Sequence, residues 1–127
     1  MKKILKCTRH TNMVGVVYDH EEVYTIDDGS VSLKVTTTFY LDQFKNKNKK
    51  ELDDWVKEKI KDSTDSVSKQ RGCTFNYTYE KNKLFKSILS IDESSMSKSI
   101  PHISKLSKDQ IYDKIKSNKE SDNFKCE

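Results

Sequence analysis

Three cysteines and three histidines are the residues of this chain best suited to chemistry, and their spacing decides which chemistry is open to them. The histidines, His10, His20 and His102, stand apart and form no HxH or HxxxH pair of the kind that binds a metal ion. The cysteines form neither a CxxC pair nor a zinc-binding spacing. The residue types suit metal or nucleophilic chemistry, but their spacing predicts neither.

Other sites of chemistry are equally poorly supported. The stretch DHEE gathers four acidic or imidazole side chains at 19–22. Successive side chains of a strand point to opposite faces, so these four cannot converge on one ion. Cys73 would need a histidine base and an electropositive site to act as a nucleophile, and no motif provides them. We predict no catalytic residue, no metal and no cofactor, and we expect a protein that is not an enzyme; an enzyme using Cys73 is the alternative.

The two terminal cysteines favour a structural role. Cys7 and Cys126 lie among polar neighbours in KCTRHTN and NFKCE. A buried free cysteine behaves as a small hydrophobe, which suits Cys73 beside Phe75 but not these two. Chain termini often lie close together in a compact domain. We therefore predict a Cys7–Cys126 disulfide, which closes a long loop and implies an oxidising compartment.

The elements that must position these residues include strands, which appear as alternating apolar and polar side chains. The run VSLKVTTTFYL at 31–41 has most of its apolar residues at odd positions, as in a long half-buried strand. The run EEVYTI precedes it across the turn DDGS, and MVGVVY could extend this first arm. A second hairpin is predicted from CTFNYTYE and LFKSILSI, which the short segment KNK joins.

Two helices are predicted from their caps and apolar stripes. Asn48 and Glu51 fit a capping box at the start of the first helix. Its apolar stripe consists of Leu52, Trp55, Val56 and Ile60. Ser107 and Gln110 fit a second capping box at the start of the final helix, in LSKDQIYDKI. The residues of that helix expected to face the core are Ile111 and Ile115.

These elements predict one α+β domain spanning residues 1–127. We expect an antiparallel sheet of four to five strands with one long and one short helix on one face, in the order β-β-α-β-β-α. Residues 1–12 would be an N-terminal extension that follows a removed or omitted export or anchor segment. The expected core consists of Leu33, Val35, Phe39, Leu52, Trp55, Val56, Ile60, Phe75, Tyr77, Leu89, Ile111 and Ile115.

The composition weighs against a nucleic-acid ligand despite a formal net charge of +4. Of the 24 basic residues only Arg9 and Arg71 are arginine, the residue that makes bidentate contacts with phosphate and guanine. The lysines are interleaved with 20 acidic residues, as on a solvated surface. No apolar run is long enough to span a membrane.

Surface recognition is the function that the residues favour. Tyr40 falls on the polar side of its predicted strand and is the tyrosine best placed for an exposed contact. The lysines of KNKNKK would form a positive loop able to touch anionic lipid headgroups or envelope polymers; they are Lys45, Lys47, Lys49 and Lys50. A loop that is merely solvated is the alternative.

Several stretches also resemble a known family: KCT, the hairpin of YTI and VSLKVTTTFY, SIDESSMSKSI, and the ending KCE. They are similar to the YehR-like small bacterial lipoproteins, which have no assigned function, and to lipoprotein-like extracytoplasmic proteins of AT-rich Gram-positive bacteria. Lys6 precedes Cys7 where a lipobox has small residues, so a disulfide suits Cys7 better than a lipid. The resemblance implies an α+β fold and an extracytoplasmic location, and it supplies no catalytic residues.

We therefore expect a lipoprotein-like, non-enzymatic domain of the cell envelope, or a secreted one, that binds a protein, peptide or envelope component. Association with a membrane surface is a further expectation. The alternative is an intracellular binding protein of a phage or mobile element that uses its lysines on nucleic acid or a nucleoprotein. Thiol oxidation separates the two, because cytosolic thiols are kept reduced. The oligomeric state is left open.

Overall fold

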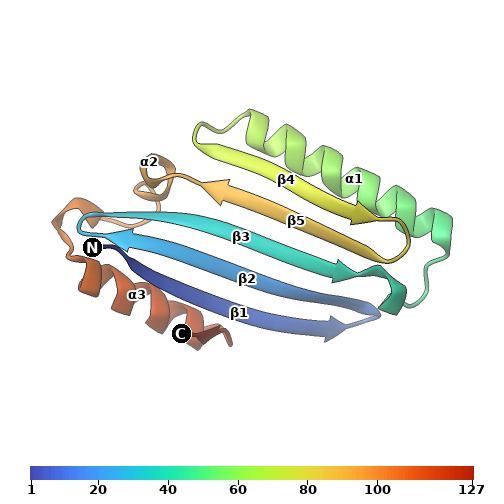
Figure 1. Ribbon diagram of the computed structural model, residues 1–127, viewed down its shortest axis with the longest axis horizontal. Coiled ribbons are helices and arrows are strands. Elements are labelled where there is room, and N and C mark those ends of the chain that lie inside the picture. Colours follow the sequence, from blue (N-terminus) through green and yellow to red (C-terminus); the bar gives the residue numbers. More distant parts are fainter.

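Three long strands at the start of the chain form the centre of the protein, whose computed structural model describes residues 1–127 (Figure 1). The strands of the molecule are β1 (Lys3–Met13), β2 (Val16–Asp27), β3 (Ser30–Tyr40), β4 (Cys73–Glu80), β5 (Leu84–Ile91) and β6 (Lys125–Cys126). They form one antiparallel sheet in the order β4-β5-β3-β2-β1-β6. The hairpin of β4 and β5 therefore joins the first three strands through the pairing of β5 with β3, and β4 is an edge strand.

The predicted strand number and element order are wrong, although the α+β class is confirmed. The sheet has six strands, and three of them precede the first long helix. Residues 1–12, expected as an extension, form most of β1, which pairs with β2 along its whole length. Val14 and Gly15, both with positive φ, form the two-residue turn between them. From Thr8 to Asn12, β1 is polar on both faces, so no alternation marks it as a strand.

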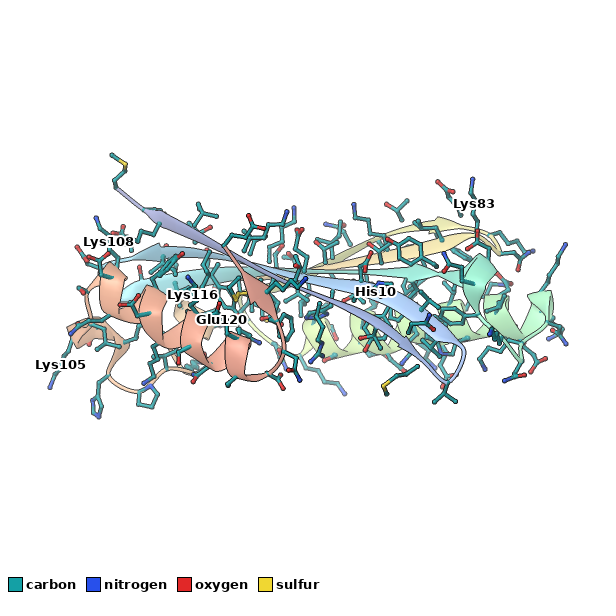
Figure 2. All side chains as sticks on the ribbon, turned by 90° about the horizontal axis from the view of Figure 1, so that it is seen from below. His10, Lys83, Lys105, Lys108, Lys116 and Glu120 are labelled. Carbon is teal, nitrogen blue, oxygen red and sulfur yellow. A yellow bond between two sulfur atoms is a disulfide. The ribbon has the colours of Figure 1, made fainter.

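The helices begin where the capping residues predict. The helices are α1 (Lys49–Ser68), the single-turn α2 (Glu93–Met96) and α3 (Lys108–Ser121), and 3-10 turns occupy Leu41–Gln43 and Ile103–Lys105. Asn48 and Glu51 close the capping box of α1, and Ser107 and Gln110 close that of α3. Both long helices lie on the same face of the sheet, and the other face carries none (Figure 2). No helix combines the length and apolar character that crossing a membrane requires.

Two clusters of buried side chains fill the space between the sheet and these helices. The cluster beside α3 contains Leu5, Cys7, Tyr24, Ile26, Val31, Ile103, Ile111, Ile115 and Phe124. The cluster beside α1 contains Leu41, Phe44, Leu52, Val56 and Phe85. Of the predicted core, Leu52, Val56, Ile111 and Ile115 are buried, and most of the others are partly buried. Tyr77 was wrongly assigned, because it lies on the edge strand and its side chain is 50% exposed.

Candidate functional site

A hollow of about 800 Å³ lies on the helix-free face of the sheet, and we call it the polar hollow. Directly opposite residues of an antiparallel pair share one face, so the register of the strands sets which side chains meet there. Across β1, β2, β3 and β5 one row runs Thr8, Glu21, Thr36 and Ile88. The neighbouring row runs His10, Asp19, Thr38 and Lys86. The only hydrophobic side chains of the polar hollow are Ile88 and Tyr40.

Asp19 connects three strands within the polar hollow. Its Oδ1 lies 2.6 Å from His10 Nδ1 on β1, and the Tyr40 hydroxyl on β3 donates to its Oδ2 at 2.6 Å. The pKa of Asp19 lies below its ordinary value. The hydrogen bond from Tyr40 lowers it most, and the hydrogen bond with His10 lowers it further. The carboxylate thus stays ionised and fixes both rings. His10 forms no hydrogen bond with a hydroxyl or thiol that it could activate as a nucleophile.

The unpaired charge of the polar hollow is positive. Lys34, Lys86 and Lys125 line it, and none of the three forms an ion pair or a side-chain hydrogen bond. Both acids of the polar hollow are engaged, Asp19 as described and Glu21 with Lys6 Nζ at 3.4 Å. The surface is therefore arranged to attract negative charge.

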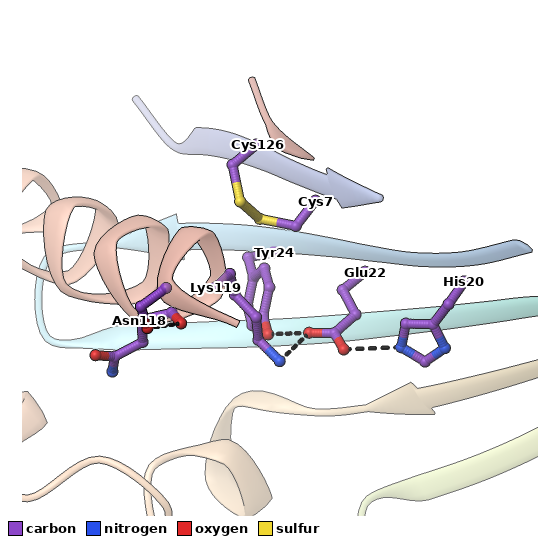
Figure 3. The surroundings of a disulfide bond; sticks show 8 residues. Cys7, His20, Glu22, Tyr24, Asn118, Lys119 and Cys126 are labelled. Atoms are coloured by element: carbon purple, nitrogen blue, oxygen red, sulfur yellow. Dashed lines mark hydrogen bonds and ion pairs between the residues drawn. A yellow bond between two sulfur atoms is a disulfide. The ribbon is translucent and has the colours of Figure 1, made fainter. Parts of the chain in front are cut away.

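Glu22, on the helix-covered face, is the only buried charged residue (Figure 3). Its carboxylate accepts a hydrogen bond from the Tyr24 hydroxyl and lies 2.7 Å from Lys119 Nζ and 2.8 Å from His20 Nε2. Burial raises the pKa of Glu22, but the hydrogen bonds from His20, Lys119 and Tyr24 outweigh it and lower the pKa to about 2. Since Lys119 belongs to α3, this buried ion pair fastens α3 to the sheet.

The low pKa of Glu22 predicts a loss of stability in acid. Its folded value of about 2 lies below the ordinary 4.5, so its contribution is complete above pH 4.5 and is lost as the pH falls toward 2. The contribution is roughly 3 kcal/mol at 1.36 kcal/mol per pKa unit. We expect Glu22→Gln to flatten the dependence of the unfolding free energy on pH in this window, as measured by urea unfolding at several pH values. An unchanged dependence would contradict the assignment.

The Cys7–Cys126 disulfide is present, which confirms the predicted pairing. The two residues lie directly opposite each other on β1 and β6, with their Cα atoms 4.1 Å apart (Figure 3). The same pairing places Lys125 opposite Thr8, at the margin of the polar hollow. The disulfide therefore holds one of the three unpaired lysines in place.

The side chains of the DHEE stretch point alternately to the two faces of the sheet, as in any strand. Asp19 and Glu21 lie on the helix-free face and line the polar hollow, whereas His20 and Glu22 contact each other on the opposite face, although His20 also borders the polar hollow. Cys73 is a half-buried free cysteine at the start of β4, and its thiol lies 3.5 Å from Gln70 Oε1. No histidine forms a hydrogen bond with it.

The predicted surface residues fall in two places. Tyr40 lines the polar hollow, but its hydroxyl is already bonded to Asp19. The four predicted loop lysines are exposed and lie outside the polar hollow; they are Lys45, Lys47, Lys49 and Lys50. Lys50 pairs with Asp54 at 2.9 Å within α1. Sequence reasoning missed the lysines of the sheet face, although Lys34 stood on the polar side of the predicted strand.

Comparison with known proteins does not assign a function to this surface. The resemblance to the YehR-like lipoproteins stays a hypothesis, so the assignment of a role depends on the polar hollow and the disulfide. The chain matches no protein-family model, no curated protein and no solved structure.

Proposed function

We propose that this protein is a non-enzymatic, extracytoplasmic domain that binds an envelope component on the helix-free face of its sheet. The polar hollow carries this proposal, because its acids are paired and its lysines are not. Ligand sites are concave and hold a ligand's orientation with a few fixed polar groups, usually among apolar side chains. The polar hollow is concave and has such fixed groups, since Asp19 holds His10 and Tyr40, but its lining is mostly polar, which suits a polar ligand. The disulfide supports an oxidising compartment.

Binding can be tested by retention on the insoluble envelope fraction of the producing cells. Thr36→Glu with Thr38→Glu places two negative charges on the floor of the polar hollow. Thr64→Glu with Ser117→Glu adds the same charge at exposed positions of α1 and α3, on the other side of the sheet. We expect the first pair to abolish retention and the control pair to preserve it. Equal retention of both, or no retention of the wild-type protein, would refute the proposal.

The compartment can be tested on the protein recovered from its own cells under conditions that block thiol exchange. We expect an intact mass that increases by about 2 Da on reduction, because two thiols replace one disulfide. Recovery with Cys7 and Cys126 as free thiols would place the protein in a reducing compartment.

A further inference from the structure

We infer that the ligand of the polar hollow is a polyhydroxylated polyanion: a sugar or polyol chain that carries phosphate or carboxylate groups along its length. This inference rests on the proposed function and specifies the chemistry of its ligand. The spacing of the unpaired lysines, the groups between them and the shortage of aromatic and apolar side chains all support it.

The three unpaired lysines are too far apart for one small anion. Lys34 and Lys86 lie on adjacent strands, four residues apart in register, which separates their Cα atoms by about 14 Å. Lys125 lies on β6, three strands away from Lys34 and two residues out of register with it, which gives about 16 Å. A ligand that reaches all three must be an extended chain with repeated negative charges.

The groups between the lysines suit the uncharged part of such a chain. Thr8 on β1 and Thr36 and Thr38 on β3 present hydroxyl groups on either side of β2. Each hydroxyl can donate and accept a hydrogen bond, as the hydroxyl groups of a sugar or polyol can. Glu21 would repel an anion, but Lys6 lies 3.4 Å from its carboxylate and offsets that charge.

The same surface is poorly suited to nucleic acid and to protein. Single-stranded nucleic acid binds by stacking its bases on aromatic side chains, and besides the histidines the polar hollow offers only Tyr40. Arg9 also lines the polar hollow, but its guanidinium is engaged: its carbon lies 4.5 Å from the centre of the Phe124 ring, and its Nη1 lies 3.7 Å from Asp122 Oδ2. Protein interfaces have an apolar centre, for which Ile88 is the one aliphatic side chain present.

Binding of defined polymers tests the inference. The probes are fluorescently labelled poly(glycerol phosphate) and polygalacturonate, with a single-stranded oligonucleotide of equal charge as comparison. The triple variant Lys34→Gln, Lys86→Gln, Lys125→Gln should bind the preferred polymer about tenfold more weakly or worse, with a shallower salt dependence. The matched control removes three charges from exposed lysines outside the polar hollow: Lys61→Gln, Lys105→Gln and Lys114→Gln. It should stay within about twofold of wild type, because these lysines make no ligand contact.

The two polymers identify the anionic group, since a phosphate-selective site favours the first and a carboxylate-selective site the second. Equal weakening by both triple variants would overturn the inference, because only net charge would then matter. Tighter binding of the oligonucleotide, or no binding of either polymer, would also overturn it. If Thr36→Glu with Thr38→Glu still abolishes envelope retention in that case, the binding face stands and only the ligand class is wrong.

Discussion

Replacing Cys7 and Cys126 together by alanine should lower the free energy of unfolding by about 4 kcal/mol. The disulfide joins residues 119 positions apart, so it removes much of the conformational freedom of the unfolded chain. Urea unfolding followed by the fluorescence of Trp55, the single tryptophan, measures the change. Cys73→Ala is the matched control, because it removes a half-buried cysteine outside any cross-link. Equal stability of the double variant and the wild type would contradict this role.

The same double variant should also weaken polymer binding. β6 has only two residues, and its pairing with β1 is the shortest in the sheet. Without the cross-link we expect β6 to separate from β1 more often, which moves Lys125 away from the polar hollow. Amide hydrogen exchange should therefore accelerate in Lys6 and Glu127, whose backbone groups bond across this edge. Unchanged exchange at these two amides would show that the short strand holds its place without the disulfide.

Phe85→Ala is the second change expected to have a large effect, about 3–5 kcal/mol of unfolding free energy. Phe85 is 1% exposed, and its ring centre lies 5.9 Å from that of Phe39 and 6.5 Å from that of Trp55. Removing the ring leaves a cavity between β5 and α1 that neighbouring rings fill only in part. Tyr77→Ala is the control, because Tyr77 touches the same cluster but is half exposed. It should cost less than half as much by thermal or urea unfolding, and equal costs would contradict this account of the core.

Local signals in the sequence predicted the elements that have a strong apolar period or a cap. The alternation at 31–41 matches β3, which ends at Tyr40. Asn48 and Ser107 mark the starts of α1 and α3 as their capping boxes predict. In each case the information lies within a few residues of the element. These elements could therefore be predicted without knowing which other elements pack against them.

The strand count failed because β1 owes its conformation to β2. Leu5 and Cys7 are its only buried residues, and the rest of the strand is polar or exposed. Its sequence has neither the alternation of a strand nor a recognisable turn signal at Val14 and Gly15, so it could not be distinguished from an N-terminal extension. The backbone hydrogen-bonding groups of β1 are satisfied by pairing with β2 over eleven residues. This pairing is a tertiary interaction that local sequence signals do not reveal.

The candidate site was only partly predictable for a related reason. Alternation placed Lys34, Thr36 and Tyr40 on the polar side of one strand. Which residues join them depends on the register with β2 and β5, and on the disulfide that brings Lys125 to the far edge. The lysines of KNKNKK are clustered in sequence, yet they lie outside the polar hollow. Clustering along the chain therefore does not show which side chains share a face of the sheet.

The most direct test of the binding face is an amide chemical-shift map of the isotope-labelled protein titrated with the polymer that it prefers. We expect saturable shifts at Thr8, Thr36, Thr38 and Lys86, and little change in α1 or α3. Shifts concentrated in the helices, or in Lys45 to Lys50, with an unchanged polar hollow would contradict this expectation.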